Sequence, residues 1–141
     1  MKPIIVQFEE ITMNIPWDSL RKFSPHVVVG IERGGVVLAT IIASRLGSAL
    51  QTIRASFYDD SKPAKKKHDT PKVDGSLPDL KGLRVLIVDD VSNTGKTLAA
   101  VKELVLSGGA AKVSTFVYAG KADFSCRPFE RCLVFPWQPT Q

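Results

Sequence analysis

Two runs of aliphatic residues constrain the fold of this chain more than any other feature. They are Val27–Ile31, which contains one glycine, and Val85–Val88. Neither run alternates with polar residues, as a strand with one face in solvent would. Continuous apolar strands are typical of parallel sheets that helices cover on both faces. We therefore expect an α/β fold with a mainly parallel, twisted sheet flanked by helices.

Each apolar run leads into a predicted helix. Residues 34–46 are apolar on nearly all sides, which indicates a buried helix that ends at Gly47. Residues 95–107 carry an apolar stripe at helical spacing, and two glycines follow them. A short helix is predicted over 16–23. Further strands are predicted over 3–8, 50–55, 112–118 and 131–135.

Composition excludes several classes of protein. With 44% hydrophobic and 23% charged residues, the chain is neither disordered nor fibrous. No apolar run approaches the ~20 residues of a membrane span, and the N-terminus does not resemble a secretory signal. Two cysteines, Cys126 and Cys132, are too few for a disulfide scaffold or a zinc site. We expect one cytoplasmic domain over residues 1–141, with no membrane partner.

The segment 57–82 fits neither a helix nor a strand. The net charge is +5, from 19 basic and 14 acidic residues, and five lysines lie between Lys62 and Lys72. A loop of this length between two core strands is typical of a functional or disordered segment. We expect a long flexible loop over about 57–82 that closes over a site. The alternative is a solvated loop without a role.

The strand Val85–Val88 runs directly into two acids, Asp89 and Asp90, and then into a polar loop that opens a helix. Ligands of open α/β sheets bind beyond the carboxyl ends of the strands. Backbone N–H groups, hydroxyls and the start of a helix can together hold one phosphate. The predicted phosphate-binding residues are Ser92, Thr94, Gly95, Lys96 and Thr97.

A phosphate beside two carboxylates requires an explanation, because like charges repel. The arrangement is reasonable if the ligand also carries hydroxyl groups, or if a divalent cation lies between the charges. A ribose 5-phosphate meets this requirement: its phosphate would occupy the loop, and its ring hydroxyls would reach Asp89 and Asp90. The alternative is that the two acids only cap the following turn.

Two other families with related motifs are excluded. Gly95-Lys96-Thr97 resembles the end of a nucleotide-triphosphate P-loop, but that motif requires a glycine at the position of Asp90. Receiver domains also carry paired acids. Their acids follow the first strand of the chain and have no phosphate loop directly behind them.

A second candidate anion site lies in Gly30–Gly35, again between a strand and a helix. Gly34 and Gly35 allow the backbone N–H groups to approach an anion closely. Arg33 adds a planar guanidinium suited to phosphate oxygens. Paired glycines alone often make only a tight turn. Beside a phosphate loop on a neighbouring strand, they predict a second anion site.

Together, these two motifs resemble those of a known family. Asp89–Thr97 resembles the phosphoribosyl pyrophosphate motif of type I phosphoribosyltransferases, and Val29–Gly35 resembles their pyrophosphate loop. The resemblance extends from about residue 14 to residue 121 and is closest to the xanthine–guanine and related purine enzymes. It implies Mg²⁺-dependent transfer of phosphoribose from phosphoribosyl pyrophosphate to a nucleobase, with a purine as the expected acceptor, and release of pyrophosphate. Such a reaction belongs to nucleotide metabolism and purine salvage.

The resemblance also implies a role for each site residue. Pyrophosphate would contact Arg33, Gly34 and Gly35. Mg²⁺ would bind at Asp89 and Asp90, directly or through water. Lys121 and Trp137, in a small hood over about 121–141, would bind the base. The catalytic residues implied are Asp89, Asp90, Tyr58 and Asn93. The partners implied are the two substrates and further copies of the chain, in a dimer or larger homo-oligomer.

Asn93 departs from the family pattern. Enzymes acting on 6-oxopurines usually carry aspartate at this position, and an amide cannot take up a proton as a carboxylate does. Asn93 therefore leaves open an alternative: a regulator of the same fold that binds phosphoribosyl pyrophosphate or a nucleotide without catalysis. The basic charge is confined to one loop beside the predicted site, which favours the enzyme and does not indicate a nucleic-acid partner.

Overall fold

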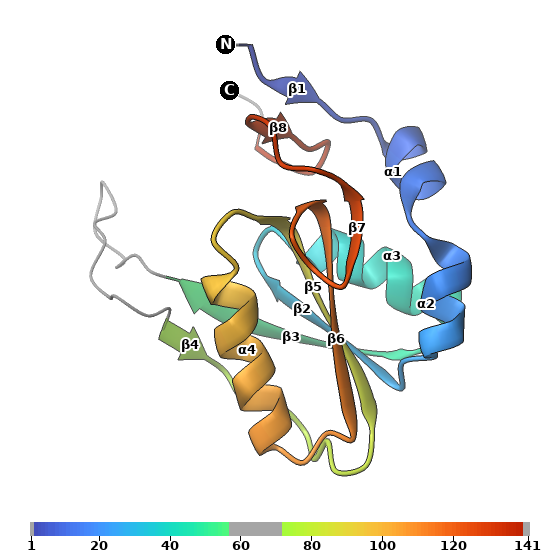
Figure 1. Ribbon diagram of the computed structural model, residues 1–141, viewed down its shortest axis with the longest axis vertical. Coiled ribbons are helices and arrows are strands. Elements are labelled where there is room, and N and C mark those ends of the chain that lie inside the picture. The colour runs from blue at the N-terminus through green and yellow to red at the C-terminus, as the bar shows by residue number, and fades with distance from the viewer. Residues whose placement is uncertain (1, 57–71, 140–141) are drawn as a thin grey trace.

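The computed structural model describes residues 2–56 and 72–139 and contains a six-stranded sheet (Figure 1). The strand order is β4-β3-β2-β5-β6-β7. Only β4 runs antiparallel to its neighbour; the other pairs are parallel. The predicted α/β class with a mainly parallel sheet is confirmed. The strands are β2 (Val27–Glu32), β3 (Ala49–Ser56), β4 (Lys72–Asp74), β5 (Arg84–Ser92), β6 (Lys112–Gly120) and β7 (Phe124–Arg127).

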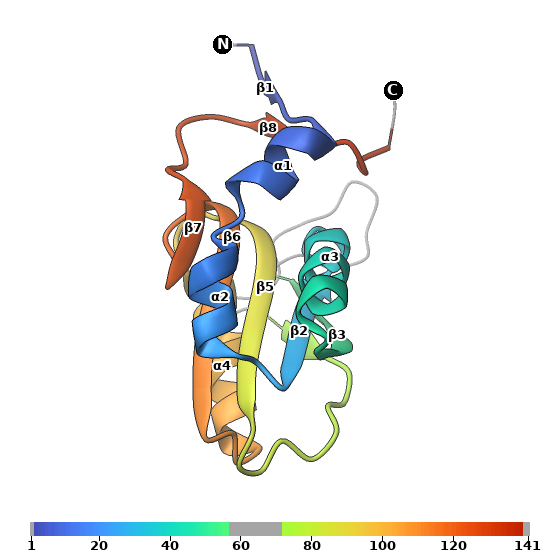
Figure 2. The ribbon, with the colours of Figure 1, turned by 90° about the vertical axis from the view of Figure 1, so that its right-hand side faces the viewer.

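Helices cover both faces of the sheet (Figure 2). On one face, α3 (Val36–Leu46) packs with α1 (Phe8–Asn14) and α2 (Trp17–Phe23); α4 (Lys96–Ser107) lies on the other. Alternate residues of one strand contribute to opposite faces: Leu86 and Val88 pack toward α3, while Ile87 packs toward α4. This two-sided burial explains why the central strands carry no polar alternation.

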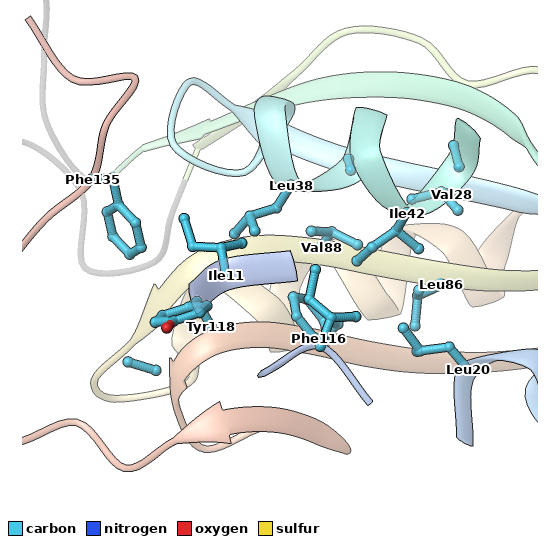
Figure 3. Packing of buried hydrophobic residues seen from close by; sticks show 14 of the residues in the cluster. Ile11, Leu20, Val28, Leu38, Ile42, Leu86, Val88, Phe116, Tyr118 and Phe135 are labelled. Carbon is cyan, nitrogen blue, oxygen red and sulfur yellow. The ribbon is translucent and has the colours of Figure 1, made fainter. Parts of the chain in front are cut away.

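The core on the α3 side extends from Leu20 and Leu86 to Phe135 near the C-terminal end of the chain (Figure 3). Leu38 and Ile42 of α3 are fully buried against the sheet. Since α3 begins directly after Gly35, its burial fixes the loop that precedes it. The helix ends at Gly47, whose φ of 70° is left-handed, as predicted. The predicted helices over 16–23, 34–46 and 95–107 agree with α2, α3 and α4 within two residues.

The two ends of the described chain form a small separate sheet. β1 (Ile4–Ile5) pairs in parallel with β8 (Leu133–Val134), so Ile4 lies opposite Leu133. This pair lies beyond the main sheet, near both termini (Figure 1). We call residues 121–139 the hood. It brings Phe135 into the same core cluster as Leu38.

The structure corrects several sequence-based boundaries. The strand predicted over 3–8 is only Ile4–Ile5, because Gln7 starts a helix: its N–H donates to Glu10 Oε1 at 2.9 Å. The strand β7 was not predicted. The loop predicted over 57–82 is too long at its C-terminal end, where β4 pairs with β3 and Leu80 is buried. Residues 57–71 lie outside the described part of the chain.

Among the described residues, no helix is long and apolar enough to cross a membrane.

Candidate active site

The two predicted anion loops lie at the same edge of the sheet. β2 and β5 are parallel neighbours, and Gly30 pairs with Val88. Their carboxyl ends therefore lie side by side. The loop after β2 contains Arg33, Gly34 and Gly35, and the loop after β5 runs from Asn93 to Gly95. The topology thus brings together segments about 60 residues apart in the sequence, as the motifs predicted.

Glycine is required where the two segments meet. A Cβ atom on Gly34 would overlap the carboxylate of Asp90. A Cβ atom on Gly35 would lie 2.8 Å from the Asp89 Cα and 3.0 Å from the Ile31 carbonyl oxygen. Neither approach leaves room for a side chain. The predicted pyrophosphate loop therefore packs directly against the acidic pair. The peptide bond between Glu32 and Arg33, at the start of this loop, is cis.

The acidic pair is half-buried and forms no ion pair in the part of the chain that the structure describes. Asp89 Oδ1 accepts the Asp90 N–H at 2.8 Å, and Asp90 Oδ1 accepts the Val91 N–H at 2.7 Å. Within residues 2–56 and 72–139, neither carboxylate forms an ion pair. Burial, and then the neighbouring charge of Asp90, raise the pKa of Asp89 to about 8. Donors or a cation from a ligand would relieve this repulsion.

The loop that follows the acidic pair has the form expected of a phosphate site. Gly95 has a φ of 79°, which favours glycine, and caps the start of α4. Ser92 is buried beneath the loop, and its Oγ has no hydrogen-bond partner among the described residues. The Lys96 N–H points to Thr94 Oγ1 at 3.4 Å. Asn93, Thr94 and Lys96 are exposed, so their polar groups are accessible to an anion.

A cavity of about 630 Å³ opens beside these loops. This volume is typical of small-molecule sites. The hood forms one wall, and the loop after β2, the first turn of α3 and Asp90 form the others. The lining residues are Glu32, Arg33, Gly34, Val36, Val37, Asp90, Trp137, Gln138 and Pro139. Of the predicted site residues, the cavity wall therefore includes Arg33, Gly34, Asp90 and Trp137.

A column of aromatic rings supports the hood wall. Trp137 stacks on Phe135 with ring centroids 4.7 Å apart and an interplanar angle of 12°. Phe135 meets the buried Tyr118 edge-on at 5.7 Å. The Tyr118 hydroxyl oxygen in turn accepts a hydrogen bond from Asn14 Nδ2 at 3.3 Å. One face of Trp137 is thus covered by Phe135, while its side chain contributes to the cavity wall.

Lys121 lies at the same edge of the sheet but does not line the cavity. It follows Gly120, which pairs with Ser92 in the register of β5 and β6. A Cβ atom on Gly120 would overlap the Ser92 carbonyl oxygen, so the end of β6 lies close to the start of the predicted phosphate loop. Lys121 itself is exposed. Tyr58, predicted to be catalytic, lies outside the described residues.

Sequence reasoning did not assign a site role to five residues of the cavity wall: Glu32, Val36, Val37, Gln138 and Pro139. Val36 and Val37 were expected only as part of a buried helix. Glu32 is part of the second anion motif, but its neighbours alone did not determine its role. Gln138 and Pro139 follow Trp137 in the hood. Their only signal in the sequence was proximity to Trp137, because their place in the wall depends on contacts between distant segments.

The acidic pair has the donor chemistry of a magnesium site. Mg²⁺ prefers oxygen ligands, and one or two carboxylates commonly bind it together with phosphate oxygens and water. Asp89 and Asp90 offer such oxygens and form no ion pair with a basic side chain of the described residues. In the described part of the chain, no group of three or more His, Cys, Asp or Glu residues could form a complete protein-only site. The residues present therefore fit a cation that binds together with a substrate.

Comparisons with known proteins agree with this geometry. A model of the phosphoribosyl transferase domain matches residues 6–128. An orotate phosphoribosyltransferase from Sulfurisphaera tokodaii is 30% identical over 112 residues, which are 79% of this chain and 52% of that protein. A transcriptional regulator from Methanocella arvoryzae is 33% identical over 95 residues, which are 67% of this chain and 46% of that protein. The chain spans about half the length of these curated relatives.

Among solved structures, a purine phosphoribosyltransferase from Pyrococcus horikoshii is similar over nearly its whole length. The TM-score is 0.82 and the sequence identity 31%, covering 100% of this chain and 97% of that one. The predicted likeness to purine enzymes is confirmed by this structure.

Proposed function

Because this chain belongs to the phosphoribosyltransferase domain family, we propose that it transfers a phosphoribosyl group from phosphoribosyl pyrophosphate to a nucleobase and releases pyrophosphate. The observation that carries the proposal is the packing of Gly34 against Asp90. It brings two anion loops to either side of an acidic pair. Phosphoribosyl pyrophosphate has the complementary pattern, with a phosphate at one end of a ribose and a pyrophosphate at the other.

Each part of the site then has a task. The loop from Ser92 to Thr97 holds the 5-phosphate through backbone N–H groups and hydroxyls. Asp89 and Asp90 accept hydrogen bonds from the ribose hydroxyls. Arg33 and the N–H groups of Gly34 and Gly35 hold the pyrophosphate as it leaves. The bond from C1 to pyrophosphate breaks, the pyrophosphate leaves with the bonding electrons, and a nitrogen of the base bonds to C1. Positive charge develops on the ribose ring during this displacement, and the fixed carboxylates stabilise it.

Asp89 and Asp90 would hold a Mg²⁺ ion, directly or through water. When bound, the ion would supply positive charge that offsets the repulsion between the carboxylates and the pyrophosphate.

We propose a purine as the acceptor base. The likeness to the purine enzyme of Pyrococcus horikoshii supports this choice, because it spans the whole chain. Trp137 would pack against the flat face of a purine, and Lys121 would contact a polar group on its edge. Asn93 has no carboxylate to accept a proton from the base, so the reaction with 6-oxopurines is expected to be slow. A dimer or larger assembly and a role in purine salvage are part of the same proposal.

The alternative is a non-catalytic regulator of the same fold, and one curated relative is a transcriptional regulator. That match covers less than half of the regulator. The match to the purine enzyme covers 97% of its chain, which favours the enzyme.

A direct assay separates these possibilities. Pyrophosphate release is followed from phosphoribosyl pyrophosphate and Mg²⁺ with guanine, hypoxanthine, xanthine, adenine, uracil or orotate. The proposal predicts release with at least one purine and none without a base. Release only with orotate would contradict the purine assignment. Tight binding of phosphoribosyl pyrophosphate without release with any base would support the regulator.

A further inference from the structure

One side chain closes the last turn of the hood. The Gln138 N–H donates to the Phe135 carbonyl oxygen at 3.1 Å. The Phe135 N–H donates to Gln138 Oε1 at 3.0 Å. Pro136 occupies the second position of this turn, where its restricted φ is favoured. Gln138 thus holds both backbone polar groups of Phe135, through its own backbone and through its side chain.

This turn sets the place of Trp137. Trp137 lies between Pro136 and Gln138, and it stacks on Phe135. Phe135 is 3% exposed and is anchored on Tyr118, so it provides a fixed base for the stack. The indole Nε1 of Trp137 has no hydrogen-bond partner among the described residues. The ring of Phe8 in α1 also lies beside the indole, with the ring centroids 6.2 Å apart. The orientation of the indole therefore depends on these two ring contacts and on the turn, and not on a hydrogen bond of its own.

The turn also faces the reacting part of the site. Trp137 and Gln138 line the same cavity as Arg33, Gly34 and Asp90. If this wall is already ordered before the base binds, less conformational entropy is lost on binding. If the hydrogen bond from the Phe135 N–H to Gln138 Oε1 is lost, the turn keeps Pro136 and the stacking of Trp137 on Phe135. Only one of its two hydrogen bonds then remains.

We propose that Gln138 is a positioning residue, which holds Trp137 in the cavity wall so that the acceptor base meets a preformed surface. The part of this inference that concerns the base rests on the proposed function. The part that concerns the position of Trp137 does not. Gln138 acts through Trp137. Its replacement should therefore affect the base and leave phosphoribosyl pyrophosphate binding nearly unchanged.

The structural test uses fluorescence of Trp137 alone. The chain has two tryptophans, so Trp17→Phe leaves Trp137 as the reporter. In that background, Gln138→Leu removes the acceptor oxygen at similar size, and Gln138→Glu keeps an acceptor. We expect acrylamide to quench the fluorescence of Trp137 more strongly in Gln138→Leu than in the Trp17→Phe parent. In Gln138→Glu, quenching should equal that of the parent. Circular dichroism verifies that each variant is folded.

The functional test uses steady-state kinetics of the same substitutions in the otherwise unchanged chain. Loss of one hydrogen bond predicts a rise of about three- to tenfold in KM for the base in Gln138→Leu, with kcat and the KM for phosphoribosyl pyrophosphate little changed. In Gln138→Glu, the KM for the base should stay close to the wild-type value.

The inference is overturned if Gln138→Leu leaves the quenching of Trp137 unchanged, or if Gln138→Glu is quenched as strongly as Gln138→Leu. It is also overturned if Trp137 becomes accessible while the KM for the base stays the same. If the wild-type chain transfers phosphoribose to no base, the proposed function fails, and the quenching experiment alone decides whether Gln138 positions Trp137.

Discussion

At the scale of single residues, the site depends on close packing between two short segments. Gly34 touches the Asp90 carboxylate, and Gly35 lies against Asp89. These contacts place the predicted pyrophosphate loop and the acidic pair at a fixed separation. The acidic pair stays without a protein cation in the described residues, so its charge is left for a ligand to balance.

Gly34→Ala tests the packing directly. The added methyl group overlaps the Asp90 carboxylate, so one of the two segments must move. We expect a loss of about 1–3 kcal/mol in the free energy of unfolding and at least about a tenfold loss in kcat/KM. Gly108→Ala is the matched control, since its Cβ would lie 3.4 Å or more from its neighbours at an ordinary φ of −77°. Equal activity of the two variants would contradict the packing account.

Asp89→Asn tests the electrostatics of the free protein. The pKa of Asp89 is raised from 3.8 to about 8, so the folded state holds this proton more tightly than the unfolded state. The stability contribution is therefore complete below about pH 4 and is lost as pH rises toward 8. Without substrate, we expect the Tm of Asp89→Asn to exceed that of the wild type by a few degrees at pH 9.

The same difference in Tm should shrink as the pH falls from 8 to 4. Thermal unfolding across this range measures it, and parallel curves for the two proteins would show that burial does not perturb Asp89. The Asp89→Asn variant should at the same time lose transferase activity.

Asn93→Asp tests the departure from the family pattern. A carboxylate at this exposed position supplies the proton acceptor that the amide lacks. We expect kcat/KM with guanine or hypoxanthine to rise by about tenfold or more, within the range that general base catalysis contributes. Pyrophosphate release measures the change. No gain with any purine would indicate that the base is not a 6-oxopurine.

At the scale of helices and strands, the hood is the part that the sequence predicted least well. Residues 121–141 were expected to carry base-binding groups, but β7 and the pairing of β1 with β8 were not foreseen. All three strands are short, with four residues in β7 and two each in β1 and β8. The pairing of β1 with β8 also joins opposite ends of the chain, with Ile4 opposite Leu133. Short strands offer too few residues for a hydrophobic period to be recognised.

The two cysteines of this region provide a test of its packing. Cys126, in β7, is half-buried, and burial raises the pKa of its thiol to about 12. Cys132 is exposed. At pH 8 we expect a thiol reagent to modify one cysteine quickly in the native protein and the second only after unfolding. Cys132→Ser should abolish the fast phase. Two fast phases in the wild type would show that β7 does not cover Cys126.

At the scale of the whole molecule, the sequence correctly predicted the central sheet and the position of the loops after β2 and β5 at one edge of it. That these loops bind anions stays a prediction. A continuous apolar strand that ends in acids or glycines can be recognised from neighbouring residues alone. The residues around Val28 and Val88 were therefore sufficient to predict the two strands and the loops that follow them. The cavity wall was different: Glu32 and Gln138 are about 100 residues apart, and only the hood brings them together. No local pattern encodes such a contact. The contribution of Tyr58 stays a prediction, because it lies outside the described residues.

The central claim is that one pocket binds phosphoribosyl pyrophosphate across two loops. A crystal structure of the chain with this substrate and Mg²⁺ is the most direct measurement. We predict the 5-phosphate within hydrogen-bonding distance of the loop Ser92–Thr97, the ribose hydroxyls on Asp89 and Asp90, and the pyrophosphate beside Arg33 and Gly34. A substrate bound elsewhere, or a ribose turned away from both carboxylates, would contradict the account.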